Sequence, residues 1–170
     1  MEKIASFCID HARLRPGLYR SRADRKDGCT VTTFDLRLTA PNREAPVEMP
    51  ALHTLEHLGA TFLRSSRAKE DVVYFGPMGC RTGLYLVMFG DLQPADILSL
   101  VEEMCSFILG YEGEIPGARP EECGNWREHD LSRAKFYAER YLRALREERN
   151  LEYPMPSKRS LTDGSRPLIC

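Results

Sequence analysis

The sequence lacks any apolar run long enough to cross a bilayer, which takes roughly 20 residues in a helix. It also lacks an excess of one charge, because 24 Lys and Arg residues oppose 25 Asp and Glu residues. That balance offers no basic surface to nucleic acid or to an anionic membrane. Residues 1–16 contain no apolar core of a signal peptide. We therefore expect no nucleic-acid partner, no membrane partner and a cytoplasmic, bacterial location.

Cysteine is present, but its context argues against disulfides. Six cysteines could form three bridges in a secreted protein. Without a signal peptide, reduced thiols are the better interpretation. The chain has 170 residues, of which 42% are hydrophobic and 29% charged, as is typical of a folded soluble protein. We expect a single domain over residues 1–170, with residues 151–170 as a loosely packed tail.

Local patterns predict a mixture of strands and helices. Asp27-Gly28 between two short runs predicts a β-hairpin, because glycine tolerates the positive φ of the tight turn. The expected strands are 17–22, 29–38, 72–75 and 81–89, and the expected helices are 50–65, 94–109 and 130–150, the last with Asp130 as its N-cap. No regular βαβ alternation is present. This order favours the α+β class, with an antiparallel sheet and helices packed on one face.

The second expected strand, residues 29–38, has two different faces. Phe34 and Leu36 share an apolar face with Leu38, whereas Asp35 and Arg37 share the other. We expect the apolar face to point into the core.

The first candidate site lies on the expected helix 50–65. His53-Thr54-Leu55-Glu56-His57 is an H-x-x-E-H arrangement, and residues four apart lie one turn apart on the same helix face. Both imidazoles can therefore reach one metal ion, with Glu56 on the same side. The alternative is an ordinary pair of histidines on a polar face. Glu56 could orient an imidazole or act as a general acid and base.

Two histidines leave a divalent ion short of ligands, since catalytic sites usually take three from the protein. Cys123 is the candidate for the third, because it lies between a loop and a helix start and a thiolate binds zinc, iron(II) or cobalt(II) well. A buried free thiol is the alternative. Cys80 lies in the turn 76–83, where glycines give a ligand room and Arg81 favours the thiolate. A structural cysteine in a tight turn is its alternative.

Several segments together resemble one family, the S-ribosylhomocysteine lyases or LuxS family. The resemblance is carried by Ser6-Phe7-x-x-Asp10-His11, Phe34-Asp35-Leu36-Arg37 with Pro41-Asn42, His53-Thr54-Leu55-Glu56-His57-Leu58, Gly76-Pro77-Met78-Gly79-Cys80-Arg81-Thr82-Gly83, and Glu122-Cys123-Gly124-Asn125. Their order and spacing fit as well. The match extends over most of the chain.

The resemblance implies a carbon–sulfur lyase that splits S-ribosyl-L-homocysteine into L-homocysteine and 4,5-dihydroxy-2,3-pentanedione, the autoinducer-2 precursor. Enediolate isomerisations and a β-elimination would carry the reaction. The resemblance further implies a homodimer with active sites at its interface and one divalent metal per subunit, Fe²⁺ with Zn²⁺ or Co²⁺ as substitutes. The metal ligands would be His53, His57 and Cys123; the catalytic residues Cys80 and Glu56; and the substrate-binding residues Ser6, His11, Arg37 and Arg64.

Two other functions fit the H-x-x-E-H helix. In a metallopeptidase, Glu56 would activate water for attack on an amide, but such an enzyme would not need the Cys80 turn. A non-catalytic metal-binding protein would keep the metal ligands without either catalytic residue.

Overall fold

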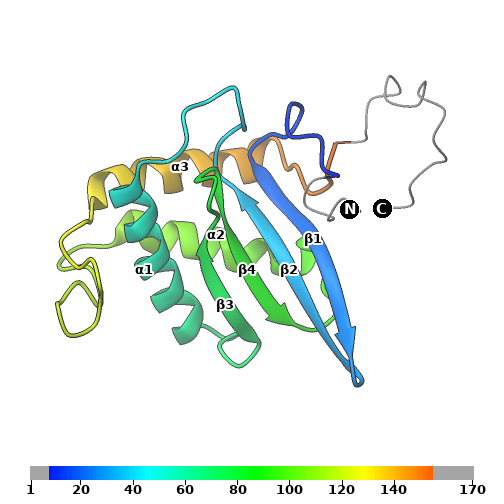
Figure 1. Ribbon diagram of the computed structural model, residues 1–170, viewed down its shortest axis with the longest axis horizontal. Helices are drawn as coiled ribbons and strands as arrows, with labels where there is room; N and C mark the ends of the chain where they lie inside the picture. Colours follow the sequence, from blue (N-terminus) through cyan, green and yellow to red (C-terminus); the bar gives the residue numbers. More distant parts are fainter. Residues whose placement is uncertain (1–7, 155–170) are drawn as a thin grey trace.

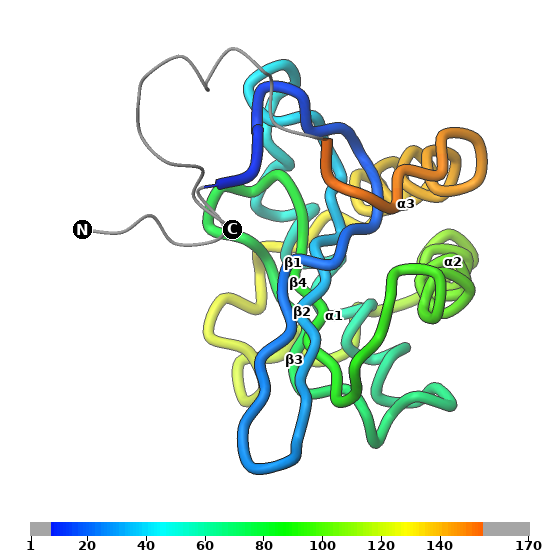
Figure 2. The backbone as a smooth tube through the Cα atoms, turned by 90° about the vertical axis from the view of Figure 1, so that its right-hand side faces the viewer, coloured from blue at the N-terminus to red at the C-terminus, as the bar shows by residue number. Residues whose placement is uncertain are grey.

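In residues 8–154, the part of the chain that the computed structural model describes, four strands form one antiparallel sheet (Figure 1). The strands are β1 (Gly17–Lys26), β2 (Cys29–Arg37), β3 (Val72–Pro77) and β4 (Gly83–Phe89), in the spatial order β1-β2-β4-β3. The helices are α1 (Met49–Ser65), α2 (Pro94–Gly110) and α3 (Leu131–Glu147). Figure 2 shows α2 and α3 on the same side of the sheet. The expected α+β architecture is confirmed.

The hairpin between β1 and β2 closes where the sequence predicts it. Lys26 pairs with Cys29, and the two residues between them, Asp27 and Gly28, have φ angles of 51° and 79°. Two positive φ values match the right-handed twist of the flanking strands. β1 pairs with β2 as far as Lys26, four residues beyond the predicted end.

The core lies between the sheet and the helices. Phe34 and Leu36 of β2 are fully buried in it, and Leu38 is 4% exposed, so the predicted inner face of this strand is confirmed. On the helix side, α3 begins after Asp130, whose side chain accepts a hydrogen bond from the backbone N–H of Arg133. This is the predicted N-cap, and it satisfies a donor that the helix itself leaves open.

One strand starts later than predicted. We expected a strand from residue 81, but Arg81 has a φ of 58° and belongs to the turn. The Met78 N–H donates to the carbonyl of Gly83 at 3.0 Å, and this bond closes the turn before β4 begins. Cys80 therefore lies at the tip of a β3–β4 turn rather than at a strand end.

No helix of residues 8–154 lies on the other face of the sheet (Figure 2). Tyr74 and Phe89 are 49% and 46% exposed there, because they pair with Val87 and Val31 on the outward side of the pleat. Among residues 8–154, no helix is both long and apolar enough to cross a membrane. Residues 151–154 of the expected tail pack at the edge of this face. Residues 155–170 lie outside the described part, so the tail itself stays a prediction.

Candidate metal centre

Helix α1 presents its two histidines on the side away from the core. Pro50 lies in its first turn, where its missing N–H leaves no helical bond unmade. Leu55 and Leu58 are 3% and 0% exposed and face the core. His53 and His57 are half-buried, with ring centroids 4.6 Å apart. One helical turn thus brings both imidazoles to one place, as the sequence predicts.

A loop before α3 adds two more donors to these histidines. The backbone N–H of Asp130 donates to the carbonyl of Pro50 at 3.3 Å, which holds this loop against the start of α1. Cys123 then lies with its Sγ 3.4 Å from the Nε2 of His53, and the His129 ring stacks on the His53 ring at 4.2 Å. The resulting metal group has ligand atoms within 4.8 Å of one another, from His53, His57, Cys123 and His129.

The two histidines of α1 are held in a defined tautomer. The Nδ1 of His53 lies 3.0 Å from the carbonyl oxygen of Glu128, and the Nδ1 of His57 lies 2.7 Å from that of Pro116. Because a carbonyl can only accept, each Nδ1 carries the hydrogen and each Nε2 keeps its lone pair. Backbone acceptors of this kind orient metal-ligating histidines in many proteins.

The ring hydrogen of His129 can be assigned in the same way, from its contact with the Thr54 hydroxyl. The Thr54 hydroxyl has one hydrogen, which it donates to the Pro50 carbonyl at 2.8 Å. The Nδ1 of His129, 3.2 Å from that oxygen, must therefore be the donor. Its Nε2 is buried and has no hydrogen-bond partner in the described part of the chain. Burial and the neighbouring His53 and His57 lower the pKa of His129 to about 4, which keeps the ring neutral.

The donor set fits a single divalent metal. Three imidazole lone pairs and one thiol converge, and a buried lone pair without a partner is costly unless a cation or a hydrogen bond satisfies it. Imidazole and thiolate together suit zinc, iron(II) and cobalt(II). The structure thus brings together the three ligands predicted from the sequence, His53, His57 and Cys123.

His129 is the residue of this group that the sequence reasoning missed. It follows Cys123 by six positions, in a stretch with no helical or strand period to place its side chain. The one available signal was the position of His129 directly before Asp130, the expected N-cap of α3. It gave no reason to direct the ring at α1, which lies about 75 residues earlier in the chain.

Cys80 belongs to a second group, the thiol group, made of Cys80, Thr82 and Arg37. Its Sγ lies 3.1 Å from the Thr82 hydroxyl and 3.9 Å from Nη1 of Arg37. Burial raises the pKa of the Cys80 thiol, but the hydrogen bonds from Thr82 and the Arg37 charge outweigh it, so the pKa is lowered from its ordinary value. No hydrogen bond or ion pair within residues 8–154 connects the thiol group to the metal group.

The remaining predicted residues belong to neither of these two groups. Glu56 is half-buried on α1, and its carboxylate makes no hydrogen bond with another described residue. Arg64, about 10 Å further along the helix than His57, donates to the carbonyls of Val72 and Val73. The Nδ1 of His11 lies 2.9 Å from the carbonyl oxygen of Ile9. Ser6 lies outside the described residues.

The fold and the metal group define an α+β protein of one domain with a candidate metal site and, separately, a thiol of lowered pKa. Comparison with known proteins narrows this class. The model of the family described as S-Ribosylhomocysteinase (LuxS) matches residues 4–152. The chain belongs to this family.

Three relatives named S-ribosylhomocysteine lyase illustrate the similarity. The protein from Finegoldia magna is 51% identical over 156 residues, which cover 91% of this chain and 99% of the relative. That from Borreliella burgdorferi is 49% identical over 157 residues, covering 91% and 100%. That from Porphyromonas gingivalis is 51% identical over 158 residues, covering 91% and 99%.

Proposed function

We propose that this chain is a carbon–sulfur lyase that cleaves S-ribosyl-L-homocysteine to L-homocysteine and 4,5-dihydroxy-2,3-pentanedione, the autoinducer-2 precursor. The observation that carries the proposal is the convergence of His53, His57 and Cys123 in a chain that belongs to the LuxS family over almost its whole length. The named activity of its relatives supports the same substrate.

Release of a free thiol from S-ribosylhomocysteine tests this function directly. The metal-loaded chain should release homocysteine, measured with a thiol reagent after the protein is removed. Cys80→Ser should retain its metal and release none. If the metal-loaded wild-type chain releases no thiol but cleaves a peptide substrate, the lyase assignment is wrong and the peptidase alternative takes its place.

For the metal we propose Fe²⁺, with Zn²⁺ or Co²⁺ as substitutes, held by His53, His57 and Cys123. When bound, a divalent ion supplies Lewis-acid stabilisation of the negative charge that develops in the enediolate steps. Catalytic sites keep one coordination position open to substrate. We therefore assign three ligands and place the imidazole of His129 beside the fourth position.

The proton transfers fall to Cys80 and Glu56. Moving the carbonyl along the sugar removes and replaces protons on adjacent carbons, and the sulfur then leaves from the carbon β to the carbonyl. The lowered pKa of Cys80 supports a thiolate that accepts such a proton near neutral pH. Glu56 lies on the helix between the two histidines, with a carboxylate that no described residue engages. It is placed to serve the later transfers and the elimination.

The amino-acid end of the substrate calls for polar partners, for which we propose Ser6, His11 and Arg64. Arg64 would have to exchange the carbonyls of Val72 and Val73 for the substrate carboxylate. Arg37 is 2% exposed, so we propose that it acts through Cys80.

We further propose that the chain works as a homodimer with its active sites at the interface, in the reducing cytoplasm. Within residues 8–154 no hydrogen bond or ion pair joins the metal group to the thiol group, which supports a site completed by a second subunit. Tyr74 and Phe89 are exposed on the sheet face away from α2 and α3, and exposed large apolar side chains support a second subunit covering that face. Free thiols at Cys29, Cys80, Cys105 and Cys123 suit a reducing compartment.

A further inference from the structure

Asp35 and Arg37 of β2 form an ion pair that is almost fully buried, although both lie on the sheet face away from the helices. Their side chains are 1% and 3% exposed. Nη2 and Nε of Arg37 donate to the two carboxylate oxygens at 2.6 and 3.1 Å. Removing two charges from water is costly, and their mutual attraction offsets this only with good geometry and further hydrogen bonds. The further hydrogen bonds to Asp35 and Arg37 therefore determine how rigidly this ion pair is held in place.

The other side of the guanidinium points at the thiol group. Nη1 of Arg37 donates to the Thr82 hydroxyl and lies 3.9 Å from Sγ of Cys80. A guanidinium is planar, and its N–H groups have fixed directions. Holding Nε and Nη2 on Asp35 therefore fixes where Nη1 points. The position of the Asp35 carboxylate sets the contact between Arg37 and Cys80.

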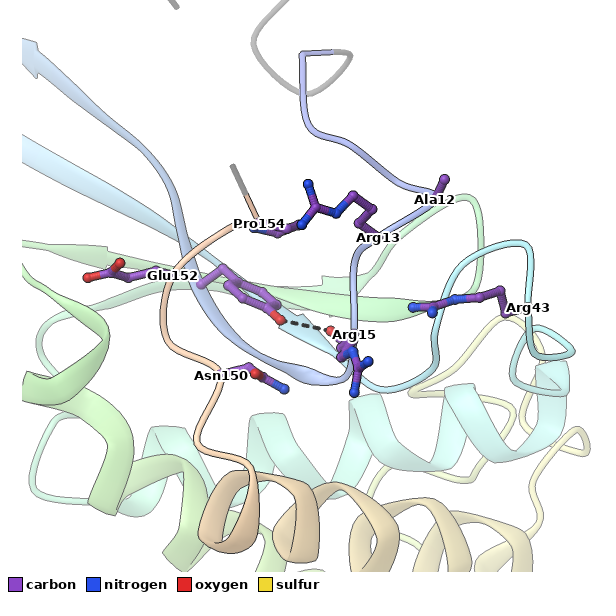
Figure 3. Close-up of a pocket in the computed structure, with 8 residues that line it drawn as sticks. Ala12, Arg13, Arg15, Arg43, Asn150, Glu152 and Pro154 are labelled. Atoms are coloured by element: carbon purple, nitrogen blue, oxygen red, sulfur yellow. Dashed lines mark hydrogen bonds between the residues drawn. The ribbon is translucent and has the colours of Figure 1, made fainter. Parts of the chain in front are cut away.

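A third hydrogen bond to the Asp35 carboxylate comes from outside the sheet, from Tyr153. Its hydroxyl donates to Oδ2 of Asp35 at 3.0 Å. Its ring stacks on Tyr19 of β1, with centroids 4.7 Å apart and planes 13° from parallel. Tyr19 is itself held, since its hydroxyl donates to the Arg15 carbonyl at 2.9 Å (Figure 3). Both the hydroxyl and the ring of Tyr153 are thus fixed.

The chain reaches this position by crossing the edge of β1. In Figure 3 the segment from Asn150 through Glu152 to Pro154 rises from the end of α3 past this strand. The Leu18 N–H donates to the Asn150 carbonyl at 3.0 Å, and the Asn150 side chain donates to the Pro16 carbonyl at 2.9 Å. At Gly17, a Cβ would lie 2.5 Å from the Asn150 carbonyl oxygen, so only glycine permits so close a crossing.

We propose that Tyr153 is a positioning residue that holds Arg37 against the Cys80 thiol through Asp35. It accounts for the third hydrogen bond to the buried carboxylate, after the two from Arg37. The segment that follows α3 is thereby coupled to a thiol on the β3–β4 turn, more than 70 residues away in sequence. The importance of this positioning for catalysis rests on the proposed role of Cys80 in proton transfer.

The charges around Cys80 determine whether loosening Arg37 raises or lowers the pKa of the thiol. The titratable groups that interact with Cys80 or its partner Arg37 are Asp35 from β2, Tyr19 from β1, Tyr85 from β4, Tyr141 from α3 and Tyr153 from the segment after α3; His11 interacts with Asp35. Burial and the Asp35 charge raise the pKa of the four tyrosines, so they stay neutral. Arg37 is then the cation of this set that contacts Cys80 and favours the thiolate. Loosening Arg37 must raise the pKa of Cys80 toward its ordinary value.

Tyr153→Phe tests the proposal, because it removes the hydroxyl and keeps the ring stacked on Tyr19. The measurement is the rate of iodoacetamide alkylation at Cys80 across a pH series, read by peptide mass spectrometry so that other thiols do not interfere. We expect a higher midpoint and roughly threefold slower alkylation at neutral pH. Arg37→Met should raise the midpoint at least as far. Tyr111→Phe is the matched control, since Tyr111 also loses one phenol bond, to the Glu114 carbonyl.

An unchanged or lowered midpoint in Tyr153→Phe overturns the proposal, whatever Arg37→Met does. An equal shift in Tyr111→Phe also overturns it, because the effect would then be general loosening. Circular dichroism of each variant confirms that the fold is retained at the assay temperature. Alkylation does not depend on turnover, so a shifted midpoint in a chain that releases no homocysteine would defeat the proposed function and leave this inference standing.

Discussion

His57 and Cys123 show how single residues contribute to the metal group. The Nε2 lone pair of His57 is free because its Nδ1–H is committed to the Pro116 carbonyl. Cys123 reaches the group from a loop whose fold its own backbone N–H helps to hold, through a 2.9 Å bond to the Arg119 carbonyl.

We predict that His57→Ala or Cys123→Ala lowers metal affinity by at least about a hundredfold, since each removes one of three ligands. Metal bound per subunit, measured by elemental analysis after anaerobic purification and dialysis against a weak chelator, should fall to near zero. Cys29→Ser is the control, because Cys29 is an exposed free thiol in the β1–β2 hairpin.

His129→Gln separates a three-ligand centre from a closed four-ligand one. With three ligands assigned, this variant should keep most of its metal under the same dialysis. Loss of metal equal to that of Cys123→Ala would show that His129 is a full ligand, and the open position that the proposed reaction needs would have to arise in another way.

At the scale of elements, the position of α1 depends on its close approach to β3. A Cβ added at Gly59 would lie 2.4 Å from Cε1 of the Phe75 ring and 3.2 Å from Sδ of Met104. Phe75 is 7% exposed, so its ring has little room to move aside. Glycine in mid-helix costs helix stability, and here it permits the packing that presents His53 and His57.

We predict that Gly59→Ala destabilises the fold by about 1 kcal/mol, because overpacking in a tight core outweighs the better helix propensity of alanine. Urea unfolding followed by circular dichroism measures this. Gly110→Ala is the matched control, since a Cβ there meets nothing within 4 Å. A Gly59→Ala variant as stable as the wild type would mean that α1 and β3 can separate without cost.

At the scale of the whole molecule, the two chemical groups lie on different elements of one subunit, and no hydrogen bond or ion pair within residues 8–154 joins them. The metal group lies between α1 and the loop before α3, whereas the thiol group lies at the β3–β4 turn and the end of β2. A site that uses both at once needs them brought together. We propose that a second copy of the chain, bound to the sheet face away from α2 and α3, brings a metal group and a thiol group together.

Mixed dimers test this assembly. His57→Ala and Cys80→Ala chains, each inactive alone, should recover roughly a quarter of wild-type activity after mixing and subunit exchange, because half of the dimers then hold one intact site built from two subunits. Mixing His57→Ala with Cys123→Ala should recover nothing, since both changes damage the same metal group. No recovery in the first mixture, despite exchange shown by native mass spectrometry, would contradict a site shared between subunits.

Local periodicity determined much of this protein. The i, i+4 spacing of His53 and His57 directs both rings to one side of a helix wherever that helix packs. Asp27-Gly28 determined the hairpin, and the alternation in β2 determined its core face. These features depend on residues a few positions apart, so one sequence was enough to predict them.

Tertiary structure decided the rest. His129 joined the metal group, and Tyr153 reached the buried Asp35, only because distant segments dock there. The alternation of β2 places Asp35 and Arg37 on its outward face, yet both are buried, and Tyr153 from the chain after α3 contacts the Asp35 carboxylate. Loops have no period, and the contacts of a loop side chain depend on which surfaces the whole chain brings together. For that reason the sequence alone could nominate Cys123 and Cys80, while the folded chain decided which neighbours each one has.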